Sequence, residues 1–266
     1  MDKLEKAMQK ARQDRAMNAG LSPLASSPFA AQGSLSQNGR ALPVINSKDV
    51  VTLTEEQLDR SRIVAHHTRS AEADVFRLLR TQILQIMARE KYRTLAITSA
   101  DYGDGKSTIA LNLAISIAMD LKQTVLLADI DLRKPNLHEF LGIEPEAGLS
   151  DYLLHDTPLP ECLLRLSFER LTILPAGKPI ERSSETLGLP KMAALAHEMK
   201  TRYPDRLIIY DMPPVLAQDD PLAFIPHVDA VLMVVREGKS KTADVTRCLD
   251  ILSNANVIGT VLNEAF

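Results

Sequence analysis

The segment SADYGDGKST, from Ser99 to Thr108, is the most informative part of the sequence, because it stands between an apolar run typical of a strand and an apolar run typical of a helix. Gly103 and Gly105 allow a tight loop whose backbone N–H groups turn inward, as phosphate-binding loops require. Lys106 is placed to reach the β- and γ-phosphates, and the hydroxyl of Ser107 to ligate Mg²⁺. The pattern G-x-x-x-x-G-K-[ST] is met except at its first glycine, where Ala100 stands. We therefore predict a Mg-ATP site formed by Gly103, Asp104, Gly105, Lys106, Ser107 and Thr108.

Around this loop, short β-rich runs alternate with helical stretches. We expect strands at 94–99, 125–129, 171–174, 207–210, 230–235 and 257–262. Helices are expected at 107–121, 191–201 and 242–253. Several of the strands are apolar on both faces, which predicts an α/β fold with a mainly parallel sheet flanked by helices on both faces. Ligands of such sheets bind at the carboxyl ends of the strands, so the residues that follow each strand are the candidate site.

Two further motifs follow strands. LLADIDLRKP, from Leu126 to Pro135, carries Asp129 and Asp131, and LIIYDMPP, from Leu207 to Pro214, carries Asp211. Acids at an ATP site suit metal coordination and proton abstraction from an attacking hydroxyl. The alternative for the first motif is a polar strand end at which Asp131 caps a turn. We predict that Lys106, Asp129, Asp131 and Asp211 are catalytic and that Ser107, Asp129 and Asp211 hold Mg²⁺.

The N-terminal part has a different organisation. Residues 1–17 show the apolar spacing of a short amphipathic helix, and residues 18–47 are rich in Ser, Gly, Pro and Ala, which is typical of a flexible linker. Thr54 and Gln57 form a capping-box pattern that opens a helix through about Ala65, and a second helix is expected at 70–89. We divide the chain into an N-terminal helix and linker, 1–49, and a P-loop domain, 50–266.

The composition excludes several functions. The formal net charge is −3, which supplies no basic field for nucleic acid. The two cysteines have no metal-like spacing, and no apolar run is long enough to span a bilayer. We expect a cytoplasmic protein without a transmembrane segment and without a nucleic-acid partner.

The three motifs together resemble the Walker A, modified Walker A′ and Walker B motifs of the bacterial tyrosine kinases, which belong to the partition-type P-loop ATPases. Two other stretches agree with this resemblance. DVFRLLR, from Asp74 to Arg80, resembles the E-x-x-R-x-x-R oligomerisation motif, with Asp74 in place of Glu. VDAVLMVVREGKSKTADV and NVIGTVLN resemble the closing strands of that family.

The resemblance implies an ATP-dependent protein tyrosine autokinase of exopolysaccharide or capsule synthesis. It further implies activation by an inner-membrane polysaccharide co-polymerase, which would bring the protein to the inner face of the membrane. Asp74, Arg77 and Arg80 would contact a neighbouring subunit of a homo-oligomer, and Asn263 would touch adenine.

Two other functions stay open at this point. No tyrosine follows Tyr210, where the family carries a tyrosine-rich tail, so the acceptor is expected to be another tyrosine such as Tyr92, Tyr102 or Tyr152, or a separate substrate. Without kinase activity, the protein would be an ATP switch in the export machinery. A partition or positioning ATPase is the third reading, but such proteins carry a lysine where this chain has Asp101.

Overall fold

The computed structural model describes residues 50–120, 123–203 and 205–264. The predicted N-terminal helix and linker at 1–49 lie outside the described residues. In chain order the helices and strands are β1 (Val50–Val51), α2 (Glu55–Arg60), α3 (Ala71–Glu90), β2 (Thr94–Ser99), α4 (Lys106–Ala118), β3 (Thr124–Asp129), α5 (Leu137–Leu141), α6 (Leu149–His155), β4 (Leu164–Leu166), β5 (Leu171–Leu174), α7 (Ser183–Leu187), α8 (Pro190–Arg202), β6 (Arg206–Asp211), α9 (Asp220–Phe224), β7 (Ala230–Arg236), α10 (Thr242–Ile251) and β8 (Val257–Asn263).

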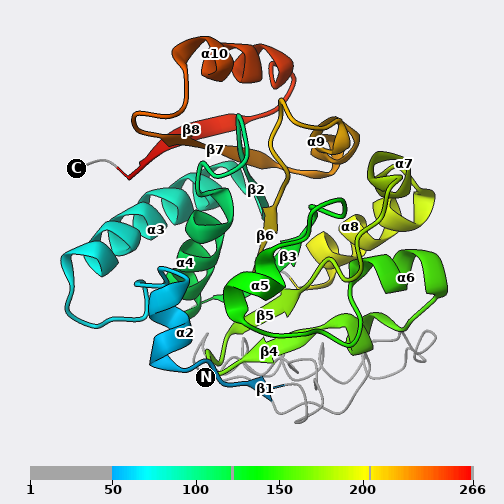
Figure 1. Ribbon diagram of the computed structural model, residues 1–266, viewed down its shortest axis with the longest axis horizontal. Coiled ribbons are helices and arrows are strands. Elements are labelled where there is room, and N and C mark those ends of the chain that lie inside the picture. Colours follow the sequence, from blue (N-terminus) through cyan, green and yellow to red (C-terminus); the bar gives the residue numbers. More distant parts are fainter. Residues whose placement is uncertain (1–49, 121–122, 204, 265–266) are drawn as a thin grey trace, which may run out of the picture. The chain divides into compact units, whose positions relative to one another are not determined.

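The strands form one eight-stranded sheet in the order β1-β4-β5-β3-β6-β2-β7-β8. Every neighbouring pair is parallel except β4 with β5. Helix α4 packs on β2, β3 and β6, and α8 packs on β6; Figure 1 shows these two helices on opposite sides of the sheet. The mainly parallel sheet with helices on both faces is thus confirmed.

The core explains why the central strands are apolar throughout. All residues of β2 and β6 are buried, as expected for strands that are covered by helices on both faces. From Lys106 to Ala118, α4 is buried at every position except Thr108, so this helix lies inside the domain. Helix α3 covers α4 and is amphipathic, with Ala73, Ile83 and Met87 buried. The phosphate-loop helix is therefore held between the sheet and a second layer of helix.

The predicted strands and long helices are present with small differences at their ends. The capping box of Thr54 and Gln57 is confirmed, and the second predicted helix is present as α3, with Ser70 as its N-cap. The expectation that the first helix runs to Ala65 is wrong, since α2 ends at Arg60. Arg62 has a φ of 53°, and the Ser61 hydroxyl donates to the carbonyl of Phe140 in α5, so a contact distant in sequence ends the helix.

Candidate functional site

The loop between β2 and α4 has the backbone that its glycines predict. Gly103 and Gly105 have φ values of 77° and 94°, in the left-handed region where a side chain is strained. Gly105 is the N-cap of α4, and α4 begins at Lys106. The loop thus delivers the positive end of the helix dipole to the point where Lys106 and Ser107 emerge.

Residues at the ends of β7 and β8, and one just after β7, hold this loop from outside. Arg236 donates to the carbonyl of Gly103 at 2.9 Å, and the ammonium of Lys239 donates to the carbonyl of Tyr102 and lies 3.5 Å from Asp104. Asn263 donates through Nδ2 to the carbonyl of Asp104 at 3.0 Å. The chain's own residues thus hold the carbonyl groups of Tyr102, Gly103 and Asp104. Sequence reasoning missed Arg236 and Lys239, although both follow a predicted strand at the ligand-binding edge.

The three predicted acids meet beside Lys106 because their strands are neighbours in the sheet. Asp129 at the end of β3 is paired in register with Asp211 at the end of β6. The Lys106 ammonium lies 3.8 Å from Oδ2 of Asp131 and 3.7 Å from Oδ1 of Asp211. Lys106 is 4% exposed, and the three carboxylates are fully buried. The structure therefore brings together all four residues predicted to be catalytic.

The three carboxylates differ in their hydrogen bonds. Oδ1 of Asp129 accepts from the N–H of Asp131, and Oδ2 accepts from the N–H groups of Asn136 and Leu137. Both oxygens of Asp129 are therefore used to hold the loop that leads into α5. By contrast, neither oxygen of Asp211 has a hydrogen-bond partner among the described residues. Asp211 is thus the acid most available to a cation.

Asp131 is held by one oxygen only. Its Oδ1 accepts from the backbone N–H of Lys134 and from Nε2 of Gln218, both at 3.0 Å. Its Oδ2 is buried without a hydrogen-bond partner among the described residues and faces the Lys106 ammonium. Asp131 does cap a turn, as the alternative reading proposed, but it also keeps one oxygen free at the site. Gln218 was not anticipated from the sequence.

Burial controls the electrostatics of the site. It raises the pKa of Asp129 to about 8, with a further increase from the nearby Asp211 carboxylate and an opposing effect of Lys106. Burial likewise raises the pKa of Asp211, again opposed by Lys106. Charged carboxylates in such surroundings are unfavourable unless cations compensate them. The buried carboxylates of the site therefore outnumber the ammonium group that opposes their charge, that of Lys106.

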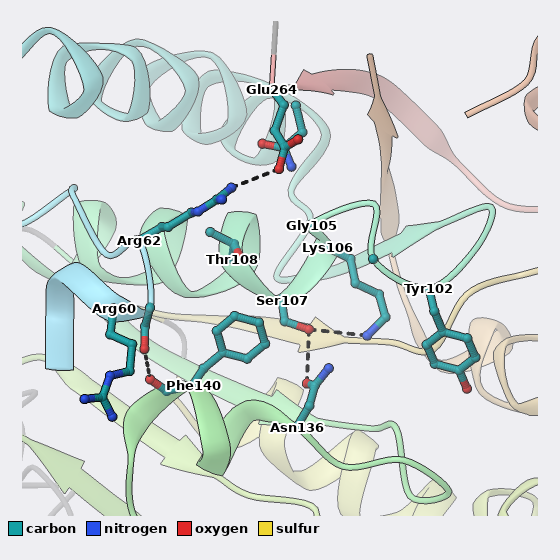
Figure 2. Close-up of a pocket in the computed structure, with 13 residues that line it drawn as sticks. Arg60, Arg62, Tyr102, Gly105, Lys106, Ser107, Thr108, Asn136, Phe140 and Glu264 are labelled. Atoms are coloured by element: carbon teal, nitrogen blue, oxygen red, sulfur yellow. Dashed lines mark hydrogen bonds and ion pairs between the residues drawn. The ribbon is translucent and has the colours of Figure 1, made fainter. Parts of the chain in front are cut away.

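A pocket of about 270 Å³ opens over the loop. In Figure 2, Lys106 and Ser107 lie in the middle of the view with Tyr102 to their right, Phe140 and Arg60 lie to the lower left, and Glu264 lies at the top. Ser107 donates to Oδ1 of Asn136 at 3.2 Å. Arg62 and Arg236 both pair with Glu264, at 2.9 Å and 2.6 Å. The pocket is lined by Arg60, Ser61, Arg62, Tyr102, Gly103, Gly105, Lys106, Ser107, Thr108, Asn136, Phe140, Asn263 and Glu264.

The site fits a magnesium–nucleotide complex. The unpartnered oxygens of Asp131 and Asp211 suit a hard cation or its water ligands, and the glycine loop with Lys106 suits phosphates. The described residues contain no group of three His, Cys, Asp or Glu able to hold a metal by themselves. Mg²⁺ bound through one or two protein ligands and the phosphates does not need such a group.

The predicted oligomerisation residues make contacts within the chain. Arg77 bonds to Asp74 at 2.6 Å and to the carbonyl of His67 at 3.1 Å. Arg80 donates to the carbonyl of Ser116 in α4 at 2.9 Å. On the same helix, Val75 and Leu78 are 64% and 62% exposed. Helix α3 therefore presents an apolar surface next to its arginines.

The chain is similar to proteins of known family. The sequence profile of the ParA family, described as NUBPL iron-transfer P-loop NTPase, matches residues 91–265. The tyrosine-protein kinase YwqD of Bacillus subtilis is 29% identical over 209 residues, which are 78% of this chain and 87% of YwqD. The succinoglycan biosynthesis transport protein ExoP of Rhizobium meliloti is 33% identical over 209 residues, which are 77% of this chain. The chain spans only 26% of the length of ExoP.

Similar chains are also found among solved structures. The kinase domain of the Escherichia coli tyrosine kinase ETK has a TM-score of 0.67 and 26% identity, covering 84% of this chain and 92% of that one. The septum site-determining protein MinD of Pyrococcus horikoshii, solved with Mg-ADP, has a TM-score of 0.54 and 25% identity over 64% of this chain and 69% of its own.

No helix among the described residues is long and apolar enough to cross a membrane.

Proposed function

Since the chain belongs to the ParA-type P-loop NTPases, among which its relatives include bacterial tyrosine kinases, we propose that it is an ATP-dependent protein tyrosine kinase of exopolysaccharide or capsule polymerisation and export. One observation carries the proposal. A phosphate loop, its lysine and three strand-end carboxylates lie in one buried cluster beneath the pocket. That cluster offers what phosphoryl transfer needs, namely charge stabilisation, metal ligands and a proton acceptor.

Each residue has a proposed role in this reaction. The ammonium of Lys106 would stabilise negative charge on the β- and γ-phosphates, and Gly103, Asp104, Gly105 and Thr108 would complete the cradle. Ser107 and Asp211 would hold Mg²⁺, which when bound neutralises phosphate charge. Asp129 is also expected as a metal ligand. It would support Ser107 and Asp211 by holding the loop that leads into α5. Asn263, which holds the loop and lines the pocket, would contact the adenine.

Oligomerisation and a membrane partner are parts of the same proposal. A homo-oligomer would use α3, where Asp74, Arg77 and Arg80 lie beside the exposed Val75 and Leu78. An inner-membrane polysaccharide co-polymerase would activate the kinase and hold it at the inner face of the membrane. The match to a quarter of ExoP, a biosynthesis transport protein, supports this partner.

The proposal is tested by Lys106→Met together with the matched control Lys178→Met, which changes an exposed lysine outside the pocket lining. We expect Lys106→Met to lower ATP turnover and phosphotyrosine formation by roughly a hundredfold or more, because a charge that stabilises the transition state is lost. Turnover of Lys178→Met should stay within about twofold of the original chain, as usual for surface changes.

The readouts are release of labelled phosphate and detection of phosphotyrosine with Mg-ATP. Normal turnover in Lys106→Met would refute the site itself. Turnover that depends on Lys106 without phosphotyrosine on this chain or on an added tyrosine peptide would refute the kinase and favour the ATP switch.

A further inference from the structure

A second cavity, of about 320 Å³, lies away from the phosphate loop. Strands β2, β3 and β6 are parallel neighbours, so their first residues share the edge of the sheet opposite to the candidate active site. The cavity is lined by residues at the start of these strands and by Leu84 and Met87, near the end of α3. It therefore belongs to a part of the fold that the proposed kinase reaction does not use.

The charges that line this cavity are unequal. Lys91, Arg93 and Arg206 are cationic, and Asp205 is the one acid among the described residues of the lining. Within the described part of the chain, no ion pair involves the side chain of any of these three cations. Three cations against one acid leave the lining with a formal charge of +2.

Arg206 distinguishes the cavity from an ordinary basic surface. It is 8% exposed, and its Nε is buried without a hydrogen-bond partner among the residues that the structure describes. The carbon of its guanidinium lies 4.2 Å from the centre of the Tyr203 ring, a contact that attracts the charge but cannot replace acceptors for five N–H groups. Burial lowers the pKa of Arg206, against the opposing effects of Tyr203 and Asp205. A buried guanidinium is costly unless an anion compensates it.

Other groups of the lining suit the uncharged part of a ligand. Oε1 of Gln123 is buried and has no hydrogen-bond partner in the described ranges, so it can accept from a ligand hydroxyl. Leu84 and Met87 of α3, with the half-buried ring of Tyr92, supply apolar contact. The volume is at the lower end of the range for small-molecule sites, roughly 300–1,000 Å³. The cavity therefore fits a small ligand with one anionic group.

From this arrangement we propose that the cavity binds a small phosphate monoester, with its phosphate on Arg206, Arg93 and Lys91 and its organic part against α3. A phosphate monoester carries a charge of about −1.5 to −2 at pH 7, which matches the lining better than the single charge of a carboxylate. The planar fork of arginine also fits phosphate oxygens. The cavity is separate from the ATP site, so this proposal does not depend on the proposed kinase function.

The test measures the binding of phenyl phosphate to the full chain by isothermal titration calorimetry. Phenyl phosphate joins a phosphate monoester to an apolar ring, and we expect a Kd of about 1 mM or lower. Phenyl sulfate has nearly the same shape with one charge fewer, and inorganic phosphate lacks the ring. Each should bind roughly tenfold more weakly than phenyl phosphate, because each loses one of the two kinds of contact.

Variants locate the bound phosphate. Arg206→Gln and Arg93→Gln should each weaken phenyl phosphate binding by roughly tenfold, since a hydrogen bond to a charged group is lost. Circular dichroism checks that each variant folds, and Arg93→Gln, which changes a half-buried side chain, keeps the test valid if Arg206→Gln does not fold. The matched control Arg165→Gln changes a half-buried arginine of β4 outside the cavity and should stay within about twofold of the original chain.

A last variant, Lys106→Met, separates this cavity from the phosphate loop and should also bind phenyl phosphate within about twofold of the original chain. Binding that is lost in Lys106→Met but survives Arg206→Gln and Arg93→Gln would place the phosphate on the phosphate loop and overturn the proposal. Absence of binding to the original chain up to about 10 mM would overturn it as well. Equally tight phenyl sulfate would overturn the match to a doubly charged group, and equally tight inorganic phosphate would overturn the contact with α3.

Discussion

The contact between Gly105 and Asn263 permits a quantitative test of how the phosphate loop is held. Gly105 has a φ of 94°, and a Cβ placed on it would lie 2.0 Å from Nδ2 of Asn263. That distance is shorter than any real contact, so the Asn263 side chain has to move away. In doing so it gives up its hydrogen bond to the carbonyl of Asp104.

Two contributions to the loss in free energy of unfolding add together in Gly105→Ala. The left-handed backbone costs about 1–2 kcal/mol for a residue with a Cβ. Loss of the Asn263 hydrogen bond adds about 1 kcal/mol, and the carbonyl left behind adds more if it stays buried. We expect a loss of about 3 kcal/mol in the free energy of unfolding, which for a domain of this size lowers the Tm by roughly 6–12 °C.

The chain offers a matched control for the first term. Gly238 also has a positive φ, of 70°, but a Cβ there meets nothing within 4 Å. Gly238→Ala should therefore cost about 1–2 kcal/mol, the backbone term alone. Both variants are compared by urea unfolding monitored by circular dichroism, with the m-value checked for constancy.

A double-mutant cycle isolates the second term. In an Asn263→Ala background the obstructing side chain is absent, so Gly105→Ala should cost only about 1–2 kcal/mol there. The coupling between the two positions should then be about 1–2 kcal/mol. Equal costs of Gly105→Ala in both backgrounds would refute the idea that Asn263 closes over the loop at this distance.

Two further predictions concern pH and the first described helix. Asp129 has a pKa of about 8 in the folded protein against 3.8 in the unfolded chain, so without nucleotide the folded state binds the extra proton. Stability that depends on this proton is complete below pH 3.8 and falls as the pH rises to about 8, and Asp129→Asn should remove that slope from unfolding free energies measured across the range. Thr54→Ala should cost about 1 kcal/mol in urea unfolding, because Thr54 and Gln57 form a reciprocal capping box on α2. A change near zero would show that α2 is held by its packing instead.

Much of the fold was readable from hydrophobic pattern because the central strands and long helices have strong signals. Strands β2, β3 and β6 are buried throughout or nearly so, and α4 begins where the glycine loop ends. The elements that were missed are short. The sequence did not predict β1, with two residues, β4, with three, or α5, with five, because none is long enough to show a period. Such elements form through contacts distant in sequence, such as the pairing of Val50 with Arg165.

The site was predictable to the extent that chain polarity determines it. Parallel strands end at one edge, so Asp129, Asp131 and Asp211 had to lie near the loop that follows β2. The same reasoning applied to the end of β7 would have found Arg236 and Lys239. It would not have found Gln218, whose contact with Asp131 depends on the path of the loop after β6.

The clearest limit of sequence reasoning is the pair Asp129 and Asp131. In the sequence the two acids look equivalent, since either could bind metal, accept a proton or cap a turn. Hydrogen bonds separate them, because Asp129 uses both oxygens on backbone N–H groups while Asp131 uses one. A carboxylate with both oxygens bound to N–H groups is fixed in its loop, whereas one held by a single oxygen is oriented and keeps the other oxygen free at the site. Which acid keeps a free oxygen at the site therefore follows from which N–H groups the folded loop presents, and the residue pattern alone does not contain that information.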